Sequence, residues 1–450
     1  MTRPENQKSL LFVSIDFPPA RTSGIYRPVY WTKYMIEAGW DITLLTAARH
    51  LSTVEDNSLA DMIDPRLKVI RATAPMPLNI TGRVYDQYKK TTATAGAATQ
   101  SSLKARIFKS LKRFILSPLF RLIENFVIIP DNYIIWSLKN LPKAYRLIKK
   151  NNISHLLVTS PPQSVQVMGL LLSYLTDVHY ITDFRNSWTD NQPYRNRLRE
   201  KMEKFLERKV LQRSRAVINM SPGDIDRLLE RMPDYPREKL SVITNGYNES
   251  DFVDYAGPHR TDPTEPLTLV YVGSMYPHSG DSTAKALKIL VEKGYDRNDL
   301  RLSIIGFSDA SFDQLIREYG AEHLVDNQGF VDHDKLVRSY HLYDIMYLTT
   351  GGTPFYHKGA LPGKIFEYMR MEKPILHVGI EGTTHQMLIK SGLETFVPLD
   401  DPTGIAQAII DLIERKKSSS LNVTPDRDYA RSFEWRELAA KADQIISGVR

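Results

Sequence analysis

The chain has 450 residues and no cysteine, with 42% apolar and 25% charged residues. At about 150 residues per domain the length predicts two or three domains, and the composition is that of an ordinary globular protein. The lack of cysteine excludes disulfides, zinc–thiolate sites and a cysteine nucleophile, and it fits a reducing compartment. No stretch reaches the roughly 18 apolar residues that cross a bilayer, so we expect a cytoplasmic protein.

The net charge of +7 is concentrated in one segment, residues 103–150. This segment holds eleven lysines and arginines but only Glu124 and Asp131 as acidic residues, so the rest of the chain is slightly acidic. A nucleic-acid-binding protein usually spreads its cations over a face with aromatic or glycine-rich readers. Because no such signature occurs, we expect no nucleic-acid partner.

Apolar residues recur among these cations at a spacing close to that of a helix. An amphipathic basic helix followed by apolar residues 119–129 is typical of contact with a membrane surface. Each cation near anionic lipid adds about 1 kcal/mol of attraction, so inner-leaflet lipid is a candidate partner of residues 103–150, with the protein peripheral on the membrane. The alternative is a core-packing helix with a solvated basic face. The apolar residues are Leu103, Ile107, Leu111, Phe114 and Ile115.

Short apolar runs alternate with helical patterns through the first half of the chain. The run Leu10–Ile15 predicts a buried strand, and a loop with Gly24 leads from it to a helix over Tyr26–Ala38 that Gly39 ends. Such alternation predicts a parallel sheet with helices on both faces. Further strands are predicted at Asp41–Thr46, Leu67–Ala72, His155–Thr159, His179–Thr182 and Ala216–Asn219.

The same alternation starts again after a proline-rich stretch, residues 251–266. The expected fold class is therefore α/β, with two doubly wound, Rossmann-like domains. We expect them at residues 1–250 and 267–428, joined by the linker 251–266. The strands of the second domain are predicted at Leu267–Val272, Leu302–Ile305, Ile345–Leu348, Ile375–Val378 and Glu394–Val397.

Ligands of doubly wound sheets bind beyond the carboxyl ends of the strands, so the loops there are the candidate sites. The first loop, Asp16–Gly24, carries a glycine that lets backbone approach an anion; an ordinary turn is the alternative. The second loop follows a predicted strand and carries Asp183, Arg185, Asn186 and Trp188. Asp183 and Arg185 alternate on an extended backbone, so both can point into one cleft. A structural ion pair between them is the alternative.

The third loop runs through Leu361, Pro362 and Gly363 into a predicted helix with Lys364 and Glu367. These two charges share a helix face. The cation and the helix N-terminus could meet a diphosphate, while the carboxylate could accept both hydroxyls of a ribose. The alternative is a surface Lys–Glu pair. No histidine spacing or carboxylate cluster predicts a metal, and no serine-hydrolase motif occurs.

The ordered set of motifs resembles the family-4 glycosyltransferases of the GT-B fold, over nearly the whole chain. The residues Ser160-Pro-Pro, Asp183-Phe-Arg and Trp188 look closest to a bacterial branch of surface-polysaccharide enzymes. Residues 429–450, with Phe433-Glu-Trp435, also resemble the closing helix of the family, which implies a C-terminal helix that returns to the first domain. The other motifs are the Gly24 loop, Asn245-Gly246, Tyr271–Ser274, Gly329–Val331, Leu361–Glu367 and Lys373-Pro374.

This resemblance implies a hexosyltransferase-like enzyme that uses a nucleotide-sugar donor, retains the anomeric configuration and needs no metal or other cofactor. Glu367 would contact the ribose, Phe330 and Val331 would flank the base, and Lys364 with the Gly24 loop would meet the diphosphate. The implied donor-binding set is Gly24, Arg27, Gly273, Ser274, Phe330, Val331, Leu361, Pro362, Gly363, Lys364 and Glu367.

Asp183 and Arg185 stand where relatives often place a catalytic histidine, which makes them the catalytic candidates. Asn186 and Trp188 are the candidates for the acceptor side. Two departures from the family pattern occur. Gly359 replaces the first glutamate of the Glu–(seven residues)–Glu motif. The arginine and the lysine that the family usually has near the first strand of the second domain are also missing, and Ser274 lies in that stretch. Arg27 and Arg185 are therefore further candidates for the diphosphate.

Three functions fit these residues. The first is transfer of a sugar to a lipid-linked or glycan acceptor in surface polysaccharide synthesis. The second is a GT-B enzyme that acts on a soluble sugar phosphate, which the basic segment disfavours. The third is a non-catalytic sugar-nucleotide-binding or scaffold protein, which the intact Lys364, Glu367 and Asp183-Phe-Arg185 disfavour.

Overall fold

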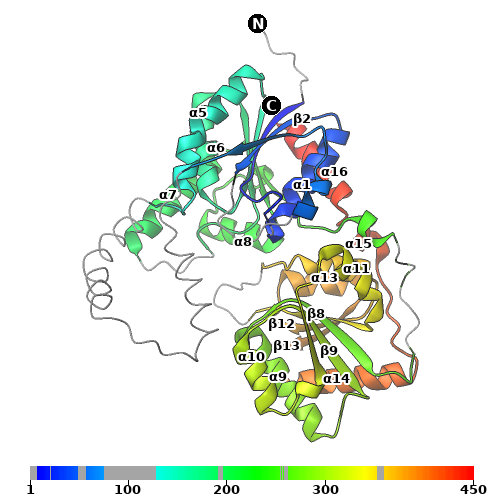
Figure 1. The fold of residues 1–450 in the computed structure, drawn as a ribbon. Helices are drawn as coiled ribbons and strands as arrows, with labels where there is room; N and C mark the ends of the chain where they lie inside the picture. Colours follow the sequence, from blue (N-terminus) through cyan, green and yellow to red (C-terminus); the bar gives the residue numbers. More distant parts are fainter. Residues whose placement is uncertain are drawn as a thin grey trace, which may run out of the picture. The chain divides into compact units, whose positions relative to one another are not determined.

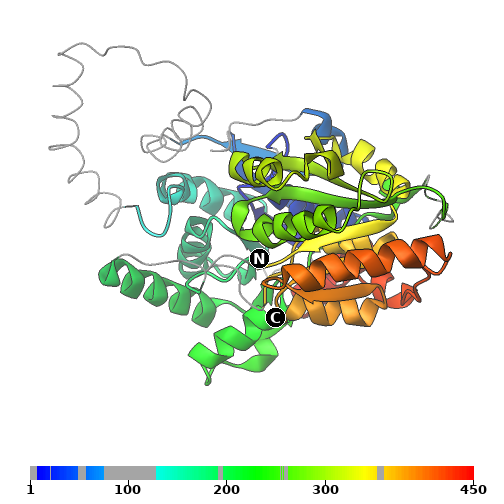
Figure 2. The ribbon, with the colours of Figure 1, turned by 90° about the horizontal axis from the view of Figure 1, so that it is seen from below.

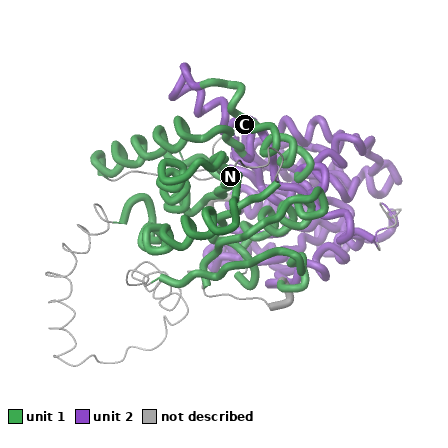
Figure 3. Tube along the Cα trace, turned by 90° about the horizontal axis from the view of Figure 1, so that it is seen from above, with its two compact units in different colours: residues 1–219, 236–241, 439–450 green, residues 220–235, 242–438 purple. Residues whose placement is uncertain are grey.

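The computed structural model describes residues 8–20, 22–48, 57–74, 128–190, 196–253, 255, 257, 262–351 and 359–449. The chain divides into two compact units, which Figure 3 colours separately. The first unit comprises residues 1–219, 236–241 and 439–450, and the second comprises residues 220–235 and 242–438. The last helix thus begins in the second unit and ends in the first.

A seven-stranded sheet in the order β3-β2-β1-β4-β5-β6-β7 forms the centre of the first unit. The strands from β3 to β6 pair in parallel; Leu11, for example, lies opposite Thr43 on one side and Leu156 on the other. The strands are β1 (Ser9–Val13), β2 (Asp41–Ala47), β3 (Lys68–Ala72), β4 (His155–Ser160), β5 (His179–Phe184), β6 (Ala216–Asn219) and β7 (Leu240–Val242).

Helices close to this sheet bury its strands, so that every residue of β1 is buried. Helix α6 lies between α5 and α7, as Figures 1 and 2 show. Helix α7 begins where the side chain of Asn196 accepts hydrogen bonds from the first free backbone N–H groups. The helical segments are η1 (Ser23–Ile25), α1 (Tyr26–Glu37), η2 (Asn57–Met62), α5 (Ile134–Lys150), α6 (Ser164–Leu175), α7 (Arg197–Arg213) and η4 (Arg237–Lys239), with α16 (Trp435–Gly448) at the end of the chain. Helix α8 (Pro222–Arg231) follows β6 along the chain but belongs to the second unit.

A six-stranded parallel sheet in the order β10-β9-β8-β11-β12-β13 forms the centre of the second unit. Its strands are β8 (Leu267–Met275), β9 (Leu300–Ser308), β10 (Val325–Gly329), β11 (Ile345–Thr349), β12 (Ile375–Gly379) and β13 (Glu394–Pro398). Its helical segments are η5 (Glu249–Phe252), α9 (Pro277–Glu292), α10 (Ala310–Glu318), η6 (Glu322–Leu324), α11 (His333–Ser339), η7 (Tyr340–Leu342), α12 (Lys364–Arg370), α13 (Thr383–Ser391), α14 (Pro402–Lys417) and α15 (Arg427–Arg431).

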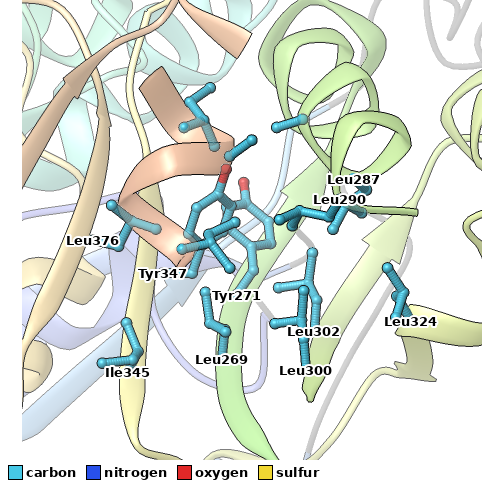
Figure 4. Close-up of a cluster of buried hydrophobic side chains, with 14 of the residues drawn as sticks. Leu269, Tyr271, Leu287, Leu290, Leu300, Leu302, Leu324, Ile345, Tyr347 and Leu376 are labelled. Carbon is cyan, nitrogen blue, oxygen red and sulfur yellow. The ribbon is translucent and has the colours of Figure 1, made fainter. Parts of the chain in front are cut away.

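Side chains of the central strand β8 alternate between two apolar cores. Leu269 and Tyr271 belong to the core with Leu287 and Leu290 of α9, which Figure 4 shows, whereas Val270 belongs to the core with α12 and α13. This is the period of two that a strand imposes. The second sheet is therefore covered by helices on both faces.

The predicted fold class is confirmed: both sheets are doubly wound, and their strand order reverses between β1 and β4 and between β8 and β11. All predicted strands are present, with small shifts at their ends. The edge strands β7 and β10 were not predicted. The sequence of β10, Val325–Gly329, is mostly polar because one side of an edge strand faces solvent, so it gives no apolar signal.

The predicted membrane-contacting segment, 103–150, is described only from residue 128 onward, and its amphipathic part lies outside the described residues. Within the part of the chain that the structure describes, no helix combines the length and apolarity required to span a bilayer.

Candidate active site

In the first unit, the loops that follow β1, β4 and β5 are joined at the carboxyl edge of the sheet by Arg185. Its Nη2 donates to Asp16 Oδ2 at 2.6 Å and to the carbonyl of Pro161, and its Nη1 donates to the carbonyl of Gly24 at 3.1 Å. This edge includes the point where the strand order reverses, the usual ligand position in such sheets. Arg185 thus fixes the shape of the loops at that position.

Gly24 allows this close approach. A Cβ atom at residue 24 would lie 2.0 Å from Arg185 Nη1 and 2.4 Å from Asp16 Oδ2, far inside contact distance. Thr22 completes the arrangement by donating from Oγ1 to Asp16 Oδ1 at 3.1 Å. Asp16 was not predicted as a site residue, although it begins the predicted loop.

A second ion pair, between Arg27 and Asp183, is fully buried. Arg27 donates from Nε to Asp183 Oδ2 at 2.9 Å and from Nη2 to Oδ1 at 2.7 Å, and both side chains are at most 1% exposed. Thr159 Oγ1 donates to Oδ2 at 2.6 Å, and the Arg27 guanidinium lies 4.1 Å from the centre of the Trp31 ring. The arrangement ties α1 to β4 and β5.

The ion pair considered in the sequence analysis therefore has different partners from those expected. Asp183 pairs with Arg27, and Arg185 pairs with Asp16. The burial of Asp183 and Arg27 favours a structural role for both residues. A catalytic role for Asp183 and a diphosphate contact for Arg27 stay predictions that this burial disfavours.

Of the two acceptor-side candidates, Asn186 is exposed and Trp188 is buried. The Trp188 indole donates from Nε1 to Glu203 Oε2 at 3.0 Å, and Glu203 in turn accepts from Arg199 Nε at 2.8 Å. Trp188 thus anchors the loop after β5 to helix α7. Acceptor contact stays a prediction for both residues, and only Asn186 presents a surface for it.

In the second unit, Lys364 and Tyr368 of α12 bind the end of strand β8. Lys364 Nζ donates to the carbonyl of Val272 at 2.6 Å, and the Val272 N–H donates to Tyr368 Oη at 3.1 Å. Strand β11 pairs with β8 only as far as Tyr271, so these side chains satisfy the two backbone groups that follow. The spacing of four residues places both side chains on one face of α12.

The Lys364 amine lies 3.7 Å from the centre of the Tyr271 ring. The residue is partly exposed, but its amine is packed between this ring and the Val272 carbonyl. Burial lowers the pKa of Lys364 to about 7, because no acidic side chain of the described residues forms an ion pair with it to offset the lost hydration. A Cβ atom on Gly273 would lie 3.5 Å from Nζ, so the glycine leaves one side of the amine open.

Glu367, one turn along α12, has its carboxylate held by two donors. His333 Nε2 lies 3.0 Å from Oε1, and Tyr340 Oη donates to Oε2 at 2.7 Å. Burial alone would lower the pKa of His333, but the hydrogen bond and charge of Glu367, with Asp251, raise it above the usual value. The Glu367 side chain is 19% exposed and can still accept hydrogen bonds.

The other predicted donor residues come from three segments of the second unit, and their exposure differs. Phe330 and Ser274 are exposed, Val331 is half-buried, and Gly363 is exposed at the start of α12. Leu361 is a core residue, 6% exposed, and Pro362 is half-buried. The helix whose N-terminus was expected to meet the diphosphate, α12, is short and comprises seven residues.

His333, Tyr340 and Tyr271 were not predicted as site residues, although Tyr271 is the first residue of the motif Tyr271–Ser274. His333 lies two residues after the motif Gly329–Val331, and that position was the available signal. Tyr340 and Tyr271 lie inside apolar patterns that predict core residues, and only the three-dimensional contacts distinguish them.

The Asp183–Arg27 pair gives a direct test of its structural role. Replacing Asp183 by Asn should lower the free energy of unfolding by about 3 to 5 kcal/mol, because it leaves the Arg27 charge buried without its counter-ion. Urea unfolding measures this change. Asp41→Asn is the matched control, since Asp41 and its partner Lys68 are both well exposed and the variant should unfold like the wild type. Wild-type stability of Asp183→Asn would contradict the structural role.

Two family models match the sequence of this chain. The family model described as Glycosyltransferase Family 4 matches residues 107–251, and the model described as Glycosyl transferases group 1 matches residues 266–415. A search of curated proteins gives no match.

Three solved structures illustrate the likeness in fold. Sucrose-phosphate synthase from Thermosynechococcus elongatus is 16% identical, with a TM-score of 0.60 over 97% of this chain and 98% of that one. HepE of Anabaena in complex with UDP-glucose is 13% identical, with a TM-score of 0.58 over 98% and 100%. WaaG, a glycosyltransferase involved in lipopolysaccharide biosynthesis, is 12% identical, with a TM-score of 0.57 over 98% and 100%. These structures share the two-domain GT-B fold, and the two family models follow one another along the chain, so the protein belongs to the family-4-like glycosyltransferases.

Proposed function

We propose that this glycosyltransferase moves a sugar from a nucleotide-sugar donor to a lipid-linked or glycan acceptor in the synthesis of a surface polysaccharide. One observation carries the donor part of the proposal. Helix α12 presents, one turn apart, the Lys364 amine, which has no acidic partner among the described residues, and the Glu367 carboxylate. The diphosphate of a nucleotide requires a cation, and the ribose requires a neighbouring group that accepts hydrogen bonds from its hydroxyls.

The diphosphate would replace the water that burial has removed from the Lys364 ammonium. Gly273 has no side chain to obstruct the approach of a phosphate oxygen to Nζ. Each Glu367 oxygen has one donor, from His333 or Tyr340, and retains a lone pair for a ribose hydroxyl. The ring of Phe330, 74% exposed, offers an apolar surface for the base.

The transfer breaks the bond between the sugar's anomeric carbon and the diphosphate and forms a bond to an acceptor oxygen, whose proton is released. Positive charge fixed at the leaving diphosphate stabilises the charge that develops there. Lys364 supplies such a charge. Arg185 is the second candidate from the sequence, although its guanidinium is already paired with Asp16. We propose retention of configuration without a metal at the reacting bond, as the family resemblance implies.

The relatives agree with the donor class. HepE, with a similar fold, is described in complex with UDP-glucose. WaaG is described as a glycosyltransferase of lipopolysaccharide biosynthesis, which supports a surface-glycan product. Sucrose-phosphate synthase is equally similar in fold, and it keeps a soluble sugar phosphate as the second candidate acceptor.

Helix α5 supports contact with anionic lipid on residues that the structure describes. It carries five cations and no acidic residue, and all five cations are exposed. Leu138 and Tyr145 are 48% and 37% exposed on the same helix. Exposed cations with apolar neighbours suit a negatively charged membrane surface. The five cations are Lys139, Lys143, Arg146, Lys149 and Lys150.

Nucleotide binding tests the donor site. Thermal unfolding with the diphosphates of uridine, guanosine, adenosine and cytidine should show one selective shift, and ligand at a hundred times its dissociation constant stabilises by about 2.7 kcal/mol. Glu367→Ala should lose that shift. Glu372→Ala is the control that should keep it, because Glu372 lies beyond the end of α12 and pairs with Arg427. No shift with any nucleotide would favour a non-catalytic protein.

The protonation of Lys364 makes nucleotide affinity depend on pH. Its pKa is about 7 in the free protein, and a bound diphosphate raises that pKa by stabilising the ammonium. Between these two values the affinity should therefore fall as pH rises, by up to about tenfold per pH unit. Calorimetric titration from pH 7 to pH 9 measures the slope. Lys364→Arg stays charged and should show a flat profile; an equal slope in both proteins would exclude Lys364 as its source.

Vesicle flotation tests the lipid contact. The wild type should float with vesicles that contain anionic lipid and should not float with neutral vesicles. The double change Lys143→Glu and Arg146→Glu in α5 should weaken flotation at least tenfold, because it replaces two attractions by two repulsions. Lys293→Glu with Lys390→Glu, exposed lysines of the second unit, is the control. Flotation that is independent of anionic lipid would favour the soluble acceptor.

A further inference from the structure

Two histidines and a glutamate that the transfer reaction does not use come together in the second unit. His377 belongs to β12, His385 to α13 and Glu394 to the start of β13. One potential ligand atom from each residue lies within 4.8 Å of the others. Three successive elements of the fold thus contribute one metal-binding group each.

The two imidazoles approach the same carboxylate from two sides. His377 Nδ1 lies 2.6 Å from Glu394 Oε1, and His385 Nδ1 lies 2.8 Å from Oε2. The side chains of His377 and Glu394 are 0% and 3% exposed, and that of His385 is 19% exposed. The cluster is therefore closed toward the core and reachable from one side, past His385.

His385 Nδ1 is the group that ordinary hydrogen bonding leaves unexplained. The atom is buried and has no hydrogen-bond partner among the described residues, although Glu394 Oε2 is only 2.8 Å away. A nitrogen this close to a carboxylate oxygen, but without a hydrogen bond to it, can direct its lone pair at a cation that the carboxylate also binds. A cation among the three atoms would satisfy the nitrogen and the carboxylate together.

The surroundings of His377 match those of a metal ligand. Its other ring nitrogen, Nε2, lies 2.7 Å from Thr350 Oγ1. With Nδ1 bound to a metal, Nε2 carries the proton and donates it to the threonine hydroxyl, and an outer hydrogen bond of this kind fixes the tautomer and the orientation of a ligating histidine. The Phe396 ring lies 4.1 Å from the His385 ring and 5.3 Å from the His377 ring, which adds an apolar wall.

We propose that His377, His385 and Glu394 bind a Zn²⁺ ion through two imidazole nitrogens and one carboxylate oxygen, with water as the fourth ligand. This mixed nitrogen and oxygen set suits zinc at about 2.0–2.2 Å from each atom. Ligand atoms around such an ion stand roughly 3.3 Å apart, so the carboxylate has to move away from the two imidazole nitrogens, now 2.6 and 2.8 Å from it, by roughly half an ångström or slightly more. The ion holds β12, α13 and β13 together and takes no part in the transfer.

Metal analysis of the full chain tests this site without reference to activity. The protein is stripped with a chelator, titrated with Zn²⁺ and freed of unbound metal, and the wild type should retain one equivalent. His385→Ala should retain none; the residue is partly exposed, so the variant should fold. Thr350→Val should bind about 10- to 100-fold more weakly, because it removes the outer contact of His377. His323→Ala, an exposed histidine of the same unit, should bind like the wild type.

Cobalt gives a second readout. Co²⁺ should give the intense visible absorption of a four-coordinate site in the wild type, and none in His385→Ala or in Glu394→Gln, which keeps the shape of the side chain but not its charge. If the folded wild type retains no zinc and gives no cobalt spectrum, the proposal is wrong and the three side chains only form hydrogen bonds with one another. Equal zinc retention by the wild type and both variants would also overturn the proposal.

Discussion

Both faces of each parallel sheet are covered by helices, so side chains that bind ligands can reach solvent only at the loops beyond the strand ends. In the first unit these are the loops after β1, β4 and β5, which Arg185 joins. In the second unit the corresponding edge is the end of β8, where α12 docks through Lys364 and Tyr368. The rest of the candidate site follows from this constraint, because it fixes which few residues lie near each other.

The cations at the two sheet edges differ in their partners. In the first unit, each cation near the edge has an anion: Arg27 has Asp183, and Arg185 has Asp16. Such pairs are costly to break and hold loops in place. In the second, Lys364 has only a carbonyl oxygen and the face of the Tyr271 ring, and burial lowers its pKa to about 7. A paired cation supports structure, whereas a cation kept from any anion of the described residues is available for the anion of a ligand.

Sequence reasoning identified the fold and the loops but not the partners within them. Strand positions follow from apolar runs, which is why β8 and β12 were predicted and the polar edge strand β10 was missed. Ion pairs depend on which loops lie next to each other in space. The spacing along the chain suggested a pair between Asp183 and Arg185, but in the fold Asp183 pairs with Arg27. The His377 cluster was missed for the same reason, since its members come from three elements without a metal-binding spacing.

Two glycines, on β8 and β9, show how the backbone makes room beside the Lys364 amine. Gly273 and Gly306 lie opposite each other on β8 and β9, with φ of +130° and +131°, a conformation that favours glycine. A Cβ atom on Gly306 would lie 2.3 Å from the Gly273 carbonyl oxygen, so any side chain there would displace the strand end. The position of β8 relative to β9 thus depends on Gly306, and the Val272 carbonyl that orients Lys364 depends on that position. The open space beside the amine is therefore a property of two neighbouring strands, not of the lysine's own loop.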